Sequence, residues 1–226
     1  MEGTERMSDP LRLAELIATR VLHDVGGLAS TLAATVELAL DEAGAAGESL
    51  TSAADLAAEL NRRVRLLRSA WGPAGEALDT ARLQDLALAT PGAHRMRLDL
   101  SSLPRGRLFS PELSRVLLNV IVLAAESLPR GGTLTLLQTS EAGVIATIRG
   151  QRAAWPETLA ASLGSEAAAW SALDTPRGLL APLVALIAHR LGVPLALAPP
   201  TRVPGRRGPP SLLIGAVPAP AVPSSP

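Results

Sequence analysis

Apolar residues recur every three or four positions through the first third of the chain. A first series occupies Ala14, Ile17, Val21, Val25, Leu28, Leu32, Val36 and Ala39. A second series occupies Ala53, Leu56, Leu60, Val64, Leu67 and Trp71. This period predicts two amphipathic helices, the first over 11–40, with Gly44 and Gly47 in the connection between them. Ser52, followed by Asp55 three residues later, predicts a capping box at the start of the second helix. The two helices would form an antiparallel hairpin over 11–73.

A single hairpin cannot bury two long apolar seams. Pairing two hairpins around a common core would cover both seams, which predicts a dimeric four-helix bundle.

The pattern changes after Trp71, where Gly72, Pro73 and Gly75 end the helical period. Shorter elements follow, and a domain boundary is predicted between 72 and 80. Helices are predicted at 81–89, 111–128 (capped by Ser110), 155–170 and 179–191, and strands at 96–100, 133–139, 144–149, 193–198 and 211–217. The strands around the turn 141–143 would form a hairpin. The segment 79–217 is therefore predicted to be an α+β domain with helices on one side of a mixed sheet. A proline-rich tail follows at 218–226.

Composition narrows the classes of function. The 21 basic and 21 acidic side chains balance, so no general attraction to nucleic acid or to an anionic membrane is expected. The chain has no cysteine, which excludes disulfides, thiolate metal sites and cysteine nucleophiles. The N-terminal residues lack the apolar core of a signal peptide, and the longest apolar run, 116–125, is too short to span a bilayer. We expect a cytoplasmic protein.

His23 is the leading candidate for chemistry. It lies between the seam residues Val21 and Val25, about 200° around the helix from each, so its side chain is predicted to face solvent. An imidazole is partly neutral near pH 7 and can act as a nucleophile. Gly26, Gly27 and Ser30 follow, and a glycine inside a helix costs about 1 kcal/mol relative to alanine. The two glycines suggest that another molecule approaches the helix closely here.

Two charged neighbours could assist His23. Asp24 could orient the imidazole ring, and Arg20, one turn earlier, could hydrogen-bond to phosphoryl oxygens. The alternative is that His23 is an inert surface residue. His94 and His189 have no identifiable partners and are interpreted as structural. The basic residues of the second helix are interpreted as a solvated face, or as a contact for an acidic protein surface: Arg62, Arg63, Arg65 and Arg68.

Three segments carry a resemblance to a known family. The first, ELIATRVLHDVGGLASTLAATVELAL, has a leucine-containing approach to a His-Asp pair, then small residues, then Glu37 and Leu38. The second is RLLRSAWGPAGEALD, and the third is LLNVIVLAAESLPRGGTLTL. Together they resemble the bacterial histidine phosphotransferases of the ChpT family, which are similar to sensor histidine kinases with a degenerate ATPase-like α/β sandwich.

The chain departs from the kinase pattern at each nucleotide contact. Asn119 matches the first asparagine of the kinase asparagine box, but Leu123 stands where a second would hold magnesium. Arg149 and Gly150 stand where an aspartate would read adenine, and Gly178 lacks the paired glycines of the phosphate-binding lid. The resemblance therefore implies a kinase-type domain that binds neither ATP nor a metal of its own.

By this resemblance, His23 would accept a phosphoryl group from the aspartate of one receiver domain and pass it to that of another. The implied partners are the receiver domains of a hybrid histidine kinase and of a response regulator, which would supply magnesium. The implied assembly is a homodimer. Two alternatives stay open: a regulator that docks on a two-component protein without carrying phosphate, and an ATP-dependent histidine kinase with an unusual nucleotide pocket.

Overall fold

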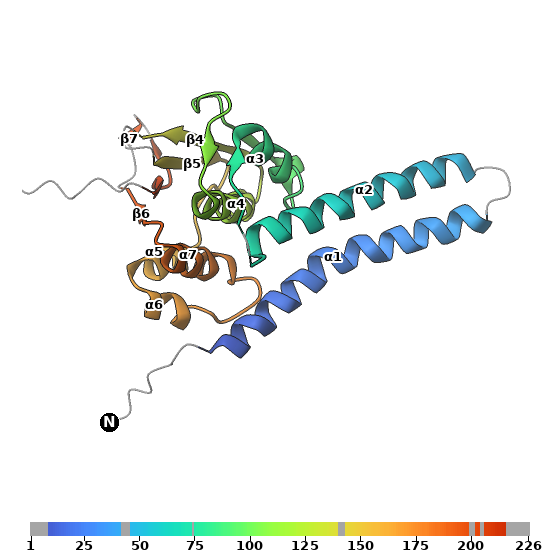
Figure 1. Ribbon diagram of the computed structural model, residues 1–226, viewed down its shortest axis with the longest axis horizontal. Coiled ribbons are helices and arrows are strands. Elements are labelled where there is room, and N and C mark those ends of the chain that lie inside the picture. Colours follow the sequence, from blue (N-terminus) through green and yellow to red (C-terminus); the bar gives the residue numbers. More distant parts are fainter. Residues whose placement is uncertain are drawn as a thin grey trace, which may run out of the picture.

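Two long antiparallel helices form the N-terminal part of the structure. The computed structural model describes residues 9–41, 46–73, 75–139, 143–198, 202–203 and 206–215. Helices α1 (Pro10–Asp41) and α2 (Ala46–Trp71) lie side by side and project from the rest of the molecule (Figure 1). The predicted helical hairpin is confirmed.

The predicted start of α2 is wrong. The helix begins at Ala46, about two turns before the predicted capping box, so Ser52 and Asp55 lie inside it. Gly47 belongs to the first turn, where its carbonyl accepts a hydrogen bond from Oγ1 of Thr51 at 2.8 Å. A glycine in the first turn weakens a helix by only about 1 kcal/mol, which long apolar packing against α1 readily offsets. Gly44 lies outside the described residues.

The remainder of the chain alternates short strands and helices, as an α+β domain should. Its helices are α3 (Thr80–Ala87), the 3₁₀ turn η1 (Ala93–Arg95), α4 (Pro111–Glu126), α5 (Glu157–Gly164), α6 (Glu166–Ser171) and α7 (Leu180–Leu191). Its strands are β1 (Leu78–Asp79), β2 (Met96–Asp99), β3 (Leu108–Phe109), β4 (Gly132–Gln138), β5 (Val144–Gly150), β6 (Leu195–Leu197), β7 (Arg202–Val203), β8 (Arg206–Arg207) and β9 (Leu212–Ile214). The predicted tail at 218–226 lies outside the described residues.

A five-stranded mixed sheet organises this domain, in the order β2-β4-β5-β9-β6. β2 and β4 are parallel, and the other neighbouring pairs are antiparallel. β4 and β5 form the predicted hairpin, in register from Gly132 opposite Gly150 to Gln138 opposite Val144. The residues 140–142 of the predicted turn lie outside the described part of the chain. In Figure 1, α4, α5 and α7 lie on one side of this sheet, in agreement with the predicted layering.

The predicted helix at 155–170 is two helices. Ser165 is extended, with φ −163°, and ends α5. Its side chain then caps α6 by accepting a hydrogen bond from the amide of Ala168 at 3.1 Å. Serine is a favoured N-cap residue, so the break follows from the sequence, although the weak apolar pattern concealed it.

Helix α4 is the centre of the core. Ser110 caps it and Pro111 occupies its first turn, as predicted. Every residue from Val116 to Ala125 is buried, and the apolar side chains of this segment share one hydrophobic cluster with the inward residues of the sheet and with α7. The longest apolar run of the sequence is therefore an interior helix. Among the described residues, no helix has the length and apolarity needed to cross a membrane.

The end of α2 is hydrogen-bonded to α4. The indole Nε1 of Trp71 donates to Oδ1 of Asn119 at 2.8 Å, and Nδ2 of Asn119 donates to the carbonyls of Ala70 at 3.0 Å and Arg115 at 2.9 Å. Nε of Arg115 donates to the same Ala70 carbonyl at 3.0 Å. These bonds satisfy carbonyls that a helix end leaves without partners, and they fix the hairpin to the second domain.

Candidate functional site

The side chain of His23 projects from α1 into solvent, as the helical period predicts. Its exposed fraction is 85%. The ring atom Nδ1 lies 3.3 Å from Oδ1 of Asp24, the next residue. Nε2 has no hydrogen-bond partner among the described residues. The arrangement presents one ring nitrogen to a carboxylate and leaves the other open to an incoming molecule.

The second carboxylate oxygen of Asp24 accepts a hydrogen bond from Arg20. Nε of Arg20 donates to Oδ2 of Asp24 at 2.9 Å, and its Nη2 donates to Oε1 of Glu126 at the end of α4. Arg20 and Asp24 are 12% and 10% exposed. Burial by itself lowers the pKa of Arg20, but the hydrogen bonds and charges of Asp24 and Glu126 outweigh it and raise that pKa. A continuous chain of contacts thus runs from α4 through Arg20 and Asp24 to the imidazole.

A second buried arginine faces this chain from α2. Arg63 is only 7% exposed, so its assignment to a solvated basic face is wrong. Its Nη2 lies 3.5 Å from Glu59, and its Nε is buried without a hydrogen bond among the described residues. Burial lowers the pKa of Arg63, although the charges of Asp24 and Glu59 act in the opposite direction. The antiparallel hairpin places Arg63 near Asp24, a proximity that the period of α2 alone could not reveal. Arg62, Arg65 and Arg68 are exposed.

The surface after His23 on α1 is open. Gly27 and Ser30 are exposed and Gly26 is half-buried. A methyl group added at either glycine would meet no atom within 4 Å, so crowding inside the described structure does not require glycine at these positions. The contact with a docking protein that these residues suggest stays a prediction, as does the phosphoryl contact of Arg20.

A cleft of about 710 Å³ opens beside His23. Its α1 wall consists of Thr19, Arg20, His23 and Asp24, and Ala125 and Glu126 of α4 contribute to it. Two connections of the second domain complete it, with Arg95 from the segment between α3 and β2 and Arg177 from the segment between α6 and α7. Sequence reasoning missed Arg95 and Arg177 because only the tertiary fold brings them to α1.

The described residues contain no group of three or more histidine or acidic side chains that could hold a metal ion. His94 and His189 are both exposed. Neither shares the cleft that contains His23.

Comparison with known proteins places the chain in a family. The sequence profile described as the histidine phosphotransferase C-terminal domain matches residues 82–202, more than half of the chain. The chain belongs to the histidine phosphotransferase family. The matched segment begins after the helical hairpin and does not include His23.

A solved structure has the same fold as this histidine phosphotransferase. It is described as a 1.7 Å structure of a bacterial phosphotransferase, with a TM-score of 0.65 at 20% sequence identity. The alignment covers 91% of this chain and 96% of that one, so the likeness includes the hairpin as well as the second domain. No curated protein matches the chain.

The residues at which the sequence departs from the kinase pattern have structural uses in this family member. The Asn119 side chain is 1% exposed, and both ends of its amide make the hydrogen bonds that join α2 to α4. Leu123, one turn later, is fully buried in the core. Gly150 lies at a close backbone approach, since a Cβ there would come within 2.4 Å of the Gly131 carbonyl. These three positions are explained by packing without any nucleotide.

Proposed function

We propose that this histidine phosphotransferase relays a phosphoryl group through His23 between the aspartates of receiver domains. One observation carries the proposal. His23 is an exposed imidazole whose Nδ1 lies against Asp24, which Arg20 and Glu126 in turn connect to the second domain. Such a ring has a defined orientation and one accessible nitrogen, as a nucleophile that serves protein partners requires.

The contacts suggest how the transfer proceeds. With a proton on Nδ1 directed at Asp24, the lone pair of Nε2 attacks the phosphorus of a receiver's phosphoaspartate. The N–P bond forms, the P–O bond to the aspartate breaks, and the aspartate leaves as a carboxylate. No proton leaves the ring, so the phosphoimidazole carries a positive charge that the Asp24 carboxylate stabilises. The second transfer reverses these steps with another receiver's aspartate.

The surroundings of His23 suit a protein partner. The open surface at Gly26, Gly27 and Ser30 admits close approach, and the cleft beside it offers the cations of Arg95 and Arg177. We place the receivers of a hybrid histidine kinase and of a response regulator there. These partners are cytoplasmic, and we propose that the receiver supplies the magnesium ion that phosphoaspartate chemistry uses.

We further propose that the second domain derives from a kinase ATPase-like domain and does not bind ATP. Asn119 stands at the first asparagine of the kinase box, and its amide is already hydrogen-bonded to Trp71 and Ala70. The side chain of Leu123 offers no oxygen to a metal. In this proposal the domain serves docking and supports the hairpin.

We propose that the active form is a homodimer. Four exposed apolar side chains follow one face of α1, and two more lie on α2: Leu11, Leu22, Val36, Leu40, Leu50 and Val64. Exposed apolar side chains along a long hairpin are costly in water, and a second copy would cover them in a four-helix bundle.

Transfer of label tests the relay directly. A receiver domain carrying ³²P on its aspartate is mixed with the full chain without ATP, and wild type is compared with His23→Ala. We expect label on wild type and none on His23→Ala. His94→Ala and His189→Ala are matched controls, because both remove an exposed histidine outside the cleft, and both should accept label as wild type does.

Label on none of the four proteins, with receiver binding intact, would contradict the relay and favour a regulator that docks without carrying phosphate. Label that appears from ATP alone would contradict the proposed loss of kinase activity.

A further inference from the structure

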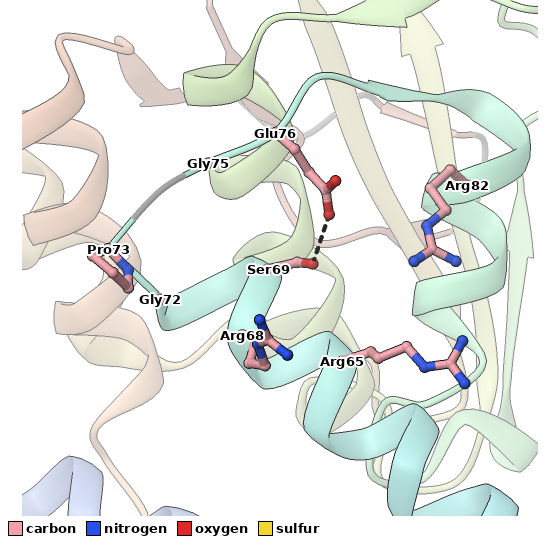
Figure 2. Close-up of a pocket in the computed structure, with 8 residues that line it drawn as sticks. All are labelled: Arg65, Arg68, Ser69, Gly72, Pro73, Gly75, Glu76 and Arg82. Carbon is pink, nitrogen blue, oxygen red and sulfur yellow. Dashed lines mark hydrogen bonds between the residues drawn. The ribbon is translucent and has the colours of Figure 1, made fainter.

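A second cleft, of about 490 Å³, lies where the C-terminal end of α2 meets α3. Figure 2 shows guanidinium groups from both helices around it. Arg65 and Arg68 extend from one face of α2, and Arg82 extends from α3. This cleft shares no lining residue with the cleft beside His23. A ligand in this cleft would therefore occupy a site separate from His23.

The arginines of this cleft have few internal partners. Arg65 and Arg68 make no ion pair or hydrogen bond among the described residues through their side chains. Arg82 uses Nη1 to bind Asp85 at 2.7 Å, which leaves its other guanidinium nitrogens available. Glu76 is the acidic residue in the lining, and its Oε1 lies 3.4 Å from Oγ of Ser69.

The helix dipole does not account for this arrangement. A cation in the last turn of a helix is favourable, which could explain Arg68. However, Arg65 lies a turn earlier and Arg82 belongs to another helix, near its N-terminal end, where a cation is unfavourable. The carbonyl of Ala70 at the end of α2 already accepts hydrogen bonds from Arg115 and Asn119. Three arginines thus line one cleft, and two of them, Arg65 and Arg68, have no side-chain partner among the described residues.

We propose that this cleft binds a small molecule that carries a phosphate group. Three arginines face one glutamate in the lining, and even with Arg82 paired to Asp85 the cleft keeps a net positive charge that would attract a phosphate. A planar guanidinium pairs with two phosphate oxygens at once, and guanidinium groups from two helices can surround one phosphate. The volume is in the range of small-molecule sites, roughly 300–1,000 Å³.

The position of the cleft gives such a ligand a structural effect. It contacts α2 and α3 together with Gly72, Pro73 and Gly75, the residues that join the hairpin to the second domain. A bound anion would therefore connect the two parts across the segment between them and resist their separation.

Titration calorimetry on the full chain tests the proposal, with inorganic phosphate and glycerol 3-phosphate as probes. We expect wild type to bind each probe saturably. In the double variant Arg65→Gln/Arg68→Gln, each substitution should lower the affinity about tenfold or more. The matched control is Arg62→Gln/Arg105→Gln, which removes the same charge from exposed positions outside the cleft. That control should bind as wild type does. Glu76→Gln should bind more tightly, because it removes the one negative charge of the lining.

The two probes separate the sources of the phosphate. Tighter binding of glycerol 3-phosphate would indicate a phosphate ester, and equal binding would indicate that inorganic phosphate suffices.

Three results would overturn the proposal. The first is that neither probe binds saturably to wild type. The second is an equal loss of phosphate affinity in Arg65→Gln/Arg68→Gln and in the control variant. The third is weaker self-association of Arg65→Gln/Arg68→Gln without any change in phosphate affinity, which would assign the arginines to contact with a second copy. Label transfer to His23 does not depend on any of these outcomes, so failure of one proposal is distinguishable from failure of the other.

Discussion

Asp24 is the residue through which the second domain reaches the exposed imidazole. One carboxylate oxygen faces His23 and the other is bonded to Arg20, so the ring and the guanidinium share one anion. In the proposed relay, a carboxylate in this position would select the ring form that has its proton on Nδ1 and would stabilise the positive charge of a phosphorylated ring.

Replacement of Asp24 by asparagine should slow phosphoryl transfer. Asp24→Asn preserves the size of the side chain but removes the charge, and a hydrogen bond to a charged group contributes about 1.5–3 kcal/mol. We expect kcat/KM for transfer from a phosphorylated receiver to fall about tenfold to hundredfold. Quench-flow measurement of label on His23 gives this rate.

The matched control for this change is Asp41→Asn, which alters an exposed aspartate at the far end of the same helix. Its rate should equal that of wild type. An unchanged rate in Asp24→Asn would remove Asp24 from the mechanism.

The residues of the site differ in how far the sequence could predict them. The exposure of His23 and its contact with Asp24 follow from helical period and adjacency. Burial of Arg63 does not, because it depends on which face of α2 meets α1. Arg95 and Arg177 reach the cleft only through the fold of segments far away in the chain.

At the scale of elements, Asn119 makes most of the hydrogen bonds that join α2 to α4. Asn119 accepts from Trp71 and donates to two carbonyls, in a site that excludes water. Buried polar groups that lose their partners are costly, so this set of bonds is stable only as a whole.

Asn119→Leu should therefore destabilise the protein. Leucine has a similar volume but leaves the Trp71 indole without an acceptor and removes a donor from Ala70, so we expect the free energy of unfolding to fall by about 2–4 kcal/mol. Trp71→Phe removes the indole donor and part of the ring but keeps both bonds that Asn119 donates, so it should cost less. Urea denaturation followed by circular dichroism measures both.

Asn61→Leu, an exposed position on α2, is the control and should change the unfolding free energy by less than about 0.5 kcal/mol. Equal stabilities of Asn119→Leu and this control would show that the bonds between α2 and α4 contribute nothing.

The long elements could be predicted from the sequence and the shortest could not. α1, α4 and α7 have either a sustained apolar period or clear caps, and β4 and β5 are seven residues long, with burial that alternates over part of each strand. β1, β3, β7 and β8 have two residues each, too few to show a period of two. Their pairing is decided by neighbours far away in the chain, as for Leu78 opposite Phe109.

At the scale of the whole molecule, the hairpin exposes more apolar surface than an isolated copy should. Leu40 is 80% exposed near the tip of α1, and Leu50 is 56% exposed on α2. We expect wild type to sediment at twice the chain mass of 23.3 kDa. Leu40→Lys/Leu50→Lys should sediment at the mass of one chain, because two lysines per copy would place four charges in the apolar core of the bundle.

Leu88→Lys/Leu108→Lys is the matched control for this experiment. Leu88 and Leu108 are exposed like Leu40 and Leu50, but they belong to the second domain. It should remain dimeric. A wild-type protein that sediments as one chain at micromolar concentration would contradict the four-helix bundle.

In the proposed relay, the single free nitrogen of His23 would also constrain how partners alternate. A donor and an acceptor would each bring an aspartate to Nε2, so the two could not occupy the same imidazole together. Turnover would then follow ping-pong kinetics, in which the first product departs before the second substrate enters. An abundant acceptor would compete with the donor for the empty histidine, so the relative cellular amounts of the two partners would set the throughput of the pathway.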